Sequence, residues 1–201
     1  MIGRAKFGVI TGLLAAMLAS GAVAQSKLGS DSDAFLNAIR DQDASKATEI
    51  LRRQGQSVTN YRGYSGETPL TVATANRSTL YIGFLIGNGA DPNLPNQRGD
   101  TPLIIASRGG LVEAVQLLIE AKAKVGLANR QGESPLIAAV QGRHARVVKM
   151  LLEAGATADT TDFSAGFSAR DYARRDTRNP ELLRLIETVK PARKIISGPI
   201  R

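Results

Sequence analysis

The chain has 201 residues, is 43% hydrophobic and carries a formal net charge of +8, all of which is ordinary for a globular protein. It has no cysteine, which excludes a disulfide framework, a thiolate nucleophile and a cysteine-bound zinc ion. The one histidine, His144, cannot by itself form a histidine cluster, so we expect no metal site. Aromatic residues make up only 4% of the chain, so we expect an aliphatic core.

Residues 1–24 have the pattern of a secretory signal peptide. Arg4 and Lys6 precede an apolar stretch over residues 7–19, and Ala22-Val23-Ala24 matches a signal-peptidase site. The stretch is shorter than the ~20 strongly apolar residues of a spanning helix, which favours cleavage over a retained anchor and leaves no integral membrane span. A short, alanine-rich signal is typical of bacteria, so we expect a periplasmic protein, with secretion as the alternative.

A five-residue motif recurs with a period of 33 residues in the middle of the chain. Gly-Glu-Thr-Pro-Leu at residues 66–70 returns as Gly-Asp-Thr-Pro-Leu at 99–103 and as Gly-Glu-Ser-Pro-Leu at 132–136. The hydroxyl residue can cap a helix N-terminus, and the proline suits the first helical position. A second apolar stretch and a turn rich in Asn, Gln and Gly follow each motif. Each unit therefore predicts two short helices and a turn.

The repeated unit resembles the ankyrin-repeat family, in which a β-turn precedes two antiparallel helices. Gly89-Ala90-Asp91-Pro92-Asn93 is also similar to the turn between repeats of that family. Lys122 stands where the neighbouring units have Gly89 and Gly155, so we expect a looser turn there. The resemblance implies an all-α solenoid with full repeats near residues 66–98, 99–131 and 132–165.

Degenerate copies of the unit flank the three full repeats. One begins at Phe35, and the other begins at Gly166, where the spacing is one residue longer. We therefore expect about five units over residues 33–190, the outer two serving as caps with one solvated face. Residues 25–32 are expected to be a flexible segment and residues 191–201 a basic, flexible tail.

The resemblance implies a binding surface rather than an active site. Ankyrin solenoids bind proteins along a concave groove made of turn tips and the first helix of each repeat. Carried over by position, this surface comprises Arg62, Tyr64, Gln97, Arg98, Asp100, Arg108, Arg130, Gln131, Glu133, Gln141 and Arg175. Arg98, Arg108, Arg130 and Arg175 could form a broken basic strip for an acidic partner. The alternative is an ordinary solvated surface, because acidic residues share the same turns.

The sequence offers no catalytic motif. His144 has no nucleophile beside it, no carboxylate pair converges on one predicted face, and no phosphate-binding loop is present. We therefore expect no enzyme and no cofactor, but a monomeric protein-interaction module of the bacterial periplasm. One alternative is an envelope-binding protein that adsorbs to anionic lipid or polysaccharide, and another is a secreted effector acting inside a host cell. A nucleic-acid partner is not expected.

Overall fold

The computed structural model describes residues 31–190. The predicted signal peptide, most of the predicted flexible segment and the predicted basic tail lie outside the described residues. The boundary predicted at residue 33 is wrong by at least two residues. Residues 31–40 already form a helix, and the Ser32 side chain in it is buried.

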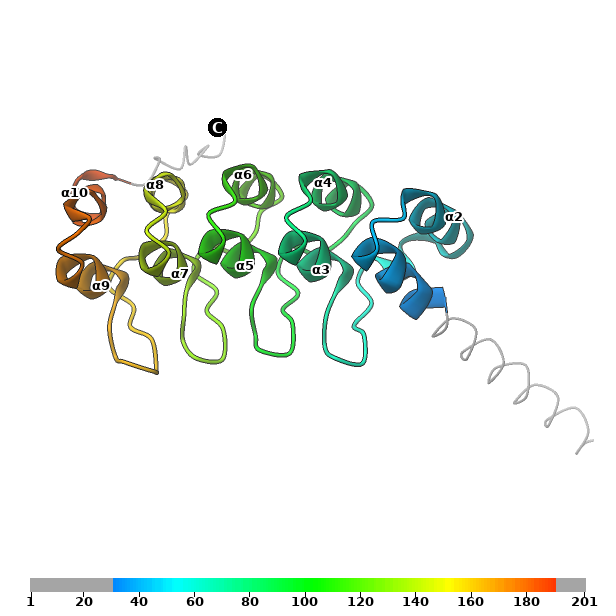
Figure 1. Ribbon diagram of the computed structural model, residues 1–201, viewed down its shortest axis with the longest axis horizontal. Helices are drawn as coiled ribbons and strands as arrows, with labels where there is room; N and C mark the ends of the chain where they lie inside the picture. Colours follow the sequence, from blue (N-terminus) through cyan, green and yellow to red (C-terminus); the bar gives the residue numbers. More distant parts are fainter. Residues whose placement is uncertain (1–30, 191–201) are drawn as a thin grey trace, which may run out of the picture.

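Within residues 31–190 the chain forms five helix pairs, which Figure 1 shows as two parallel rows. The first helices of the pairs, here called the inner helices, are residues 31–40, α3 (Pro69–Ala75), α5 (Pro102–Arg108), α7 (Pro135–Gln141) and α9 (Ala169–Arg175). The outer helices are α2 (Ala44–Gln54), α4 (Thr79–Gly87), α6 (Val112–Glu120), α8 (Ala145–Glu153) and α10 (Pro180–Thr188). A 3-10 turn, η1 (Gly55–Val58), follows α2. The predicted all-α repeat solenoid is confirmed.

Hydroxyl side chains cap the inner helices, as the motif predicts. The side-chain oxygens of Thr68, Thr101 and Ser134 each accept a hydrogen bond from the backbone N–H three residues later, at 3.2–3.3 Å. Proline occupies the first turn of α3, α5 and α7, where a missing N–H costs nothing. In α9 the cap is Ser168, and Asp171 bonds back to the Ser168 backbone. The motif therefore sets where each inner helix begins.

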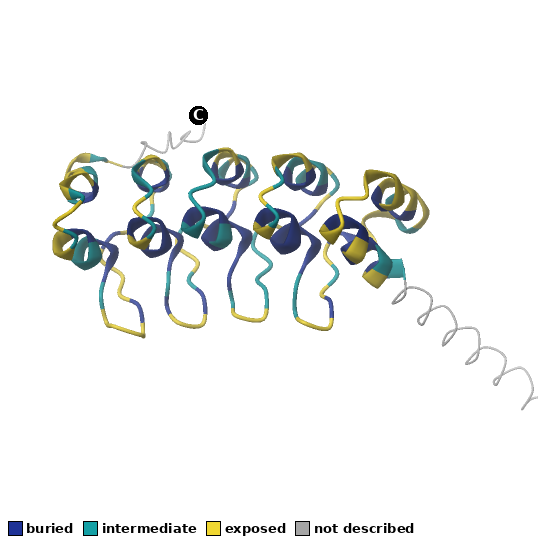
Figure 2. Cartoon of the chain, viewed as in Figure 1, coloured by how far each residue is buried: buried dark blue, intermediate teal, exposed yellow. Residues whose placement is uncertain are grey.

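The core lies where neighbouring repeats face one another. The repeated apolar positions are fully or almost fully buried, including Ala106, Val115 and Leu118 of the central unit. Helix α5 packs between α3 and α7, and α6 packs between α4 and α8. Figure 2 shows buried residues along the helices and exposed ones at the tips of the long turns. Each full repeat therefore packs its apolar faces against the repeats on both sides.

The turn after α6 is not looser than the glycine turns, which corrects the expectation. Lys122 adopts a φ of +65°, in the left-handed region that Gly155 occupies after α8. Its N–H donates to the Ile119 carbonyl, and the Ala123 N–H donates to the Leu118 carbonyl, both at 2.9 Å. A residue that lacks glycine's conformational freedom thus forms the same helix end as Gly89 and Gly155.

The packing predicts a large difference between two substitutions in α6. Leu118→Ala should lower the free energy of unfolding by about 2–5 kcal/mol, because Leu118 is fully buried between two neighbouring repeats. Glu113→Ala, on the exposed side of the same helix, should change it by less than about 0.5 kcal/mol. Urea unfolding measures both values, and equal losses would contradict this repeat register.

Candidate functional site

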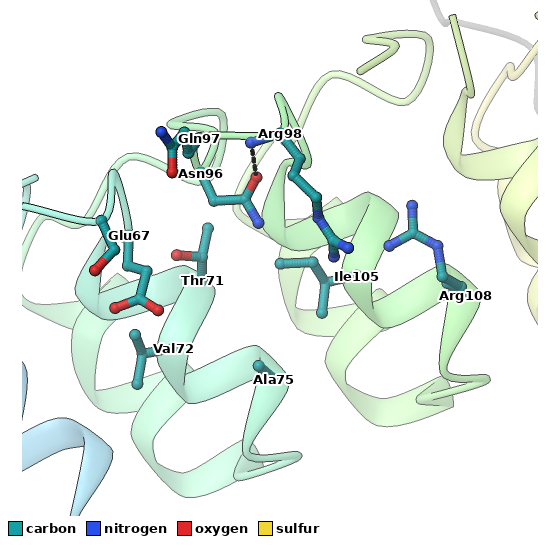
Figure 3. A pocket seen from close by; sticks show the side chains of 10 residues that line it. Glu67, Thr71, Val72, Ala75, Asn96, Gln97, Arg98, Ile105 and Arg108 are labelled. Atoms are coloured by element: carbon teal, nitrogen blue, oxygen red, sulfur yellow. Dashed lines mark hydrogen bonds between the residues drawn. The ribbon is translucent and has the colours of Figure 1, made fainter. Parts of the chain in front are cut away.

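A groove of about 430 Å³ runs between the first and second full repeats, on the side formed by the inner helices and the turn tips. Its apolar lining comes from Val72, Ala75 and Ile105, and its charged lining from Glu67, Arg98 and Arg108. Figure 3 shows Glu67, Val72 and Ala75 on the α3 side, with Arg98 and Arg108 on the α5 side. We call this surface the N-terminal groove.

The two arginines of the N-terminal groove bind the same buried carboxylate. Arg108 donates to both oxygens of Asp100, at 3.1 and 3.2 Å, and Arg98 pairs with Asp100 Oδ2 at 3.1 Å. Arg108 also pairs with Glu133 of the next repeat. The Asn129 amide donates to Asp100 Oδ1 at 2.7 Å and to Glu133 Oε2 at 3.0 Å. We call these five residues the inter-repeat network.

The inter-repeat network favours the charged forms of Asp100 and Arg108. Burial alone would raise the pKa of Asp100, but hydrogen bonds from Arg108 and Asn129 outweigh burial and lower that pKa below its ordinary value. For Arg108, burial alone would lower the pKa. The hydrogen bonds to Asp100 and Glu133 outweigh burial and raise that pKa above its ordinary value. Two cations and two anions therefore neutralise one another within the network.

The network changes the interpretation of the predicted basic strip. Arg98 and Arg108 are already paired with Asp100 and Glu133, so the strip is interrupted in the second repeat. Asp100 was predicted to contact a partner but is only 1% exposed, so that assignment is wrong. Its carboxylate lies just before α5 and points inward, where Arg108 at the end of that helix binds both of its oxygens.

The other predicted site residues fall into two groups. Those at the turn tips are exposed: Arg62, Tyr64, Gln97, Arg130 and Gln131. Gln141 and Arg175 instead line a second groove, of about 640 Å³, between the third full repeat and the C-terminal cap. We call it the C-terminal groove.

Sequence reasoning missed Asn129, which completes the inter-repeat network. A signal was available, because Asn129 lies one 33-residue period after Asn96. Asn96 accepts hydrogen bonds from the backbone N–H groups of Arg98 and Asp100, and Asn129 does the same for its own turn. The amide nitrogen of Asn129 is therefore free to bridge the two carboxylates.

His144 links two repeats. Its Nε2 lies 3.1 Å from the Arg108 carbonyl oxygen. Gly110 and Gly142 flank the ring so closely that a Cβ on either would lie about 2.5 Å from a ring atom. In the part of the chain that the structure describes, no group of three or more His, Cys, Asp or Glu residues could hold a metal ion. No helix among those same residues is long and apolar enough to cross a membrane.

The shifted pKa of Asp100 predicts a pH-dependent loss of stability. Because folding lowers this pKa, the carboxylate stabilises the fold fully above the unfolded value of about 3.9 and stops doing so as pH falls through the folded value. Asp100→Asn should lower the free energy of unfolding by about 2–3 kcal/mol at neutral pH, less than for a fully buried pair because Arg108 is partly exposed. The difference in free energy of unfolding between Asp100→Asn and wild type should become smaller below about pH 4.

Asp159→Asn is the matched control for that measurement. Asp159 also pairs with an arginine, Arg170 at 2.7 Å, but its side chain is 73% exposed. Its loss should therefore cost less than about 1 kcal/mol. Urea unfolding of both variants between neutral and acidic pH gives the comparison. If the loss in free energy of unfolding for Asp100→Asn did not depend on pH, or if the two variants lost equal amounts, Asp100 would not act through its charge.

Comparison with known proteins agrees with the geometry. A family model described as ankyrin repeats, in three copies, matches residues 81–162. A search of curated proteins finds no match. The matched span runs from α4 to the turn after α8, and the same helix pairing and capping continue in the units on either side of it. The hydroxyl caps, the in-register helix pairs and the family match together identify residues 81–162 as ankyrin repeats within the repeat solenoid.

Proposed function

We propose that the chain is a non-catalytic interaction module that binds a partner protein along its concave surface. Ankyrin repeats generally mediate protein–protein interaction. The observation that supports this use here is the N-terminal groove, where partly exposed Ile105 and exposed Ala75 adjoin charged side chains. Such a surface offers apolar burial with polar groups that fix orientation.

The inter-repeat network favours binding by holding this surface in place before a partner arrives. Arg108 is fixed by three oxygen atoms from two repeats, and Asp100 is fixed by Arg98, Arg108 and Asn129. Side chains that are already ordered lose less conformational entropy on association. A partner therefore meets a preformed groove whose charges mainly set specificity.

We also propose that this module works in the bacterial periplasm after its signal peptide is removed. The support is the sequence pattern of residues 1–24, together with the absence of cysteine from the chain, which makes folding independent of oxidising machinery. N-terminal sequencing of the exported protein tests the proposal. A first residue of Gln25 supports it, and an intact Met1 on a membrane-bound species contradicts it.

Site-specific photo-crosslinking in cells tests where the partner binds. A photoreactive residue at Ala75 or Gln141, both exposed on inner helices, should give a crosslinked product with one partner protein. The same residue at Glu113 or Lys149, exposed on outer helices, is the control and should give none. Equal products from the two groups of positions, or products only from the outer helices, would contradict binding along the groove.

Fractionation of the same cells distinguishes protein binding from the main alternative, adsorption to the cell envelope. Adsorption to anionic lipid or polysaccharide would make the protein sediment with the envelope at low salt and release it at high salt, because exposed charge interactions are screened. A groove-dependent crosslink on a protein that stays in the same fraction at both salt concentrations supports the interaction module instead.

A further inference from the structure

Two positions that recur in each repeat, one just before the inner helix and one near its end, differ in charge from repeat to repeat. The residue after the turn glycine is acidic in the full repeats, as Glu67, Asp100 and Glu133, but it is Phe167 in the C-terminal cap. A second equivalent position, near the end of each inner helix, carries an arginine in the second repeat and in the cap, as Arg108 and Arg175. Arg175 therefore has an aromatic ring where Arg108 has a carboxylate.

The Phe167 ring fixes Arg175 without neutralising it. The Arg175 guanidinium carbon lies 3.7 Å from the centre of the ring, which is cation–π geometry. The ring is itself held edge-on against Tyr172, whose hydroxyl donates to Asp162 at 2.6 Å. Over residues 31–190 Arg175 forms no ion pair, whereas Arg108 pairs with two carboxylates.

The C-terminal groove is correspondingly cationic. Three arginines and one aspartate line it: Arg143, Arg175, Arg178 and Asp176. Asp176 is bound by Arg143 at 2.6 Å, and its other oxygen accepts the Arg178 backbone N–H at 3.2 Å. The nearby Asp171 is committed to the Ser168 hydroxyl and to Arg174. The side chains of Arg175 and Arg178 are thus exposed and form no ion pair within 4 Å among the described residues, and Asp171 and Asp176 act on them only at longer range.

We propose that the C-terminal groove binds an acidic segment of the partner protein, with its carboxylates on Arg175 and Arg178. This inference rests on the proposed function and adds the chemistry of the partner. Guanidinium groups match carboxylates with two parallel hydrogen bonds, and Arg175 is already oriented for such a contact. The groove lies between α7 and α9, and its exposed arginines can meet the carboxylates of an extended peptide laid along it. The N-terminal groove does not share this role, because its arginines are neutralised internally.

A labelled hexaglutamate peptide tests the proposal, with hexaglutamine as the uncharged comparison. Fluorescence anisotropy should show that wild type binds hexaglutamate more tightly than hexaglutamine at low salt. The double variant Arg175→Gln with Arg178→Gln should weaken hexaglutamate binding by about 3–10-fold, because each exposed charge pair contributes modestly. The loss should shrink at high salt. Both side chains are exposed, so the unfolding temperature should fall only slightly, through loss of the contact between Arg175 and Phe167.

The matched control is Arg146→Gln with Lys149→Gln, which removes the same charge from the exposed side of α8. It should weaken hexaglutamate binding by less than about 2-fold, the small effect of a lower net charge. Equal losses in the two double variants, or no binding by wild type, would overturn the proposal. If the groove-dependent photo-crosslinks persist in that case, the protein-binding function stands and only the acidic segment is wrong. If the crosslinks are absent too, the proposed function fails.

Discussion

The fold depends on stacking in register, because no single repeat buries both of its apolar faces alone. The helices of each unit are short, at seven to nine residues in the full repeats, and would be marginal in isolation. They are stable because Leu118 and its equivalents Leu85 and Leu151 are fully buried between neighbours. At the two ends, exposed Glu49 and Arg184 replace the half-buried Phe84 and Met150 of the full repeats. Solvated outer positions of this kind are typical of capping repeats.

The same register decides which charges meet on the concave surface. Stacking places equivalent positions of neighbouring repeats side by side, so Arg108 reaches both Asp100 of its own repeat and Glu133 of the next. Where the acidic residue becomes Phe167, the matching Arg175 loses its counter-ion and gains an aromatic support. One periodic arrangement therefore produces a neutral groove between the first two full repeats and a cationic groove beside the C-terminal cap.

The local features of the fold could be predicted from sequence because their chemistry is local. Hydroxyl caps, first-turn prolines and left-handed glycines each act within a few residues, and the 33-residue period repeats them. The charge pairing could not be predicted, because it depends on side-chain direction and on residues 25 to 29 positions apart. Asp100 illustrates this limit: its position identified it as a turn residue, but only packing shows that it points inward. Lys122 shows the converse, since a lysine there adopts the left-handed conformation that residues with a side chain disfavour.

NMR of the arginine side chains tests the central claim, that Arg108 is committed internally while Arg175 is free. Their Nε–Hε signals report each guanidinium separately, and hexaglutamate is the titrant. The account predicts that the Arg175 signal shifts on addition of the peptide, while the Arg108 signal stays in place because its oxygen partners are already bound. A shift at Arg108 with none at Arg175 would contradict it.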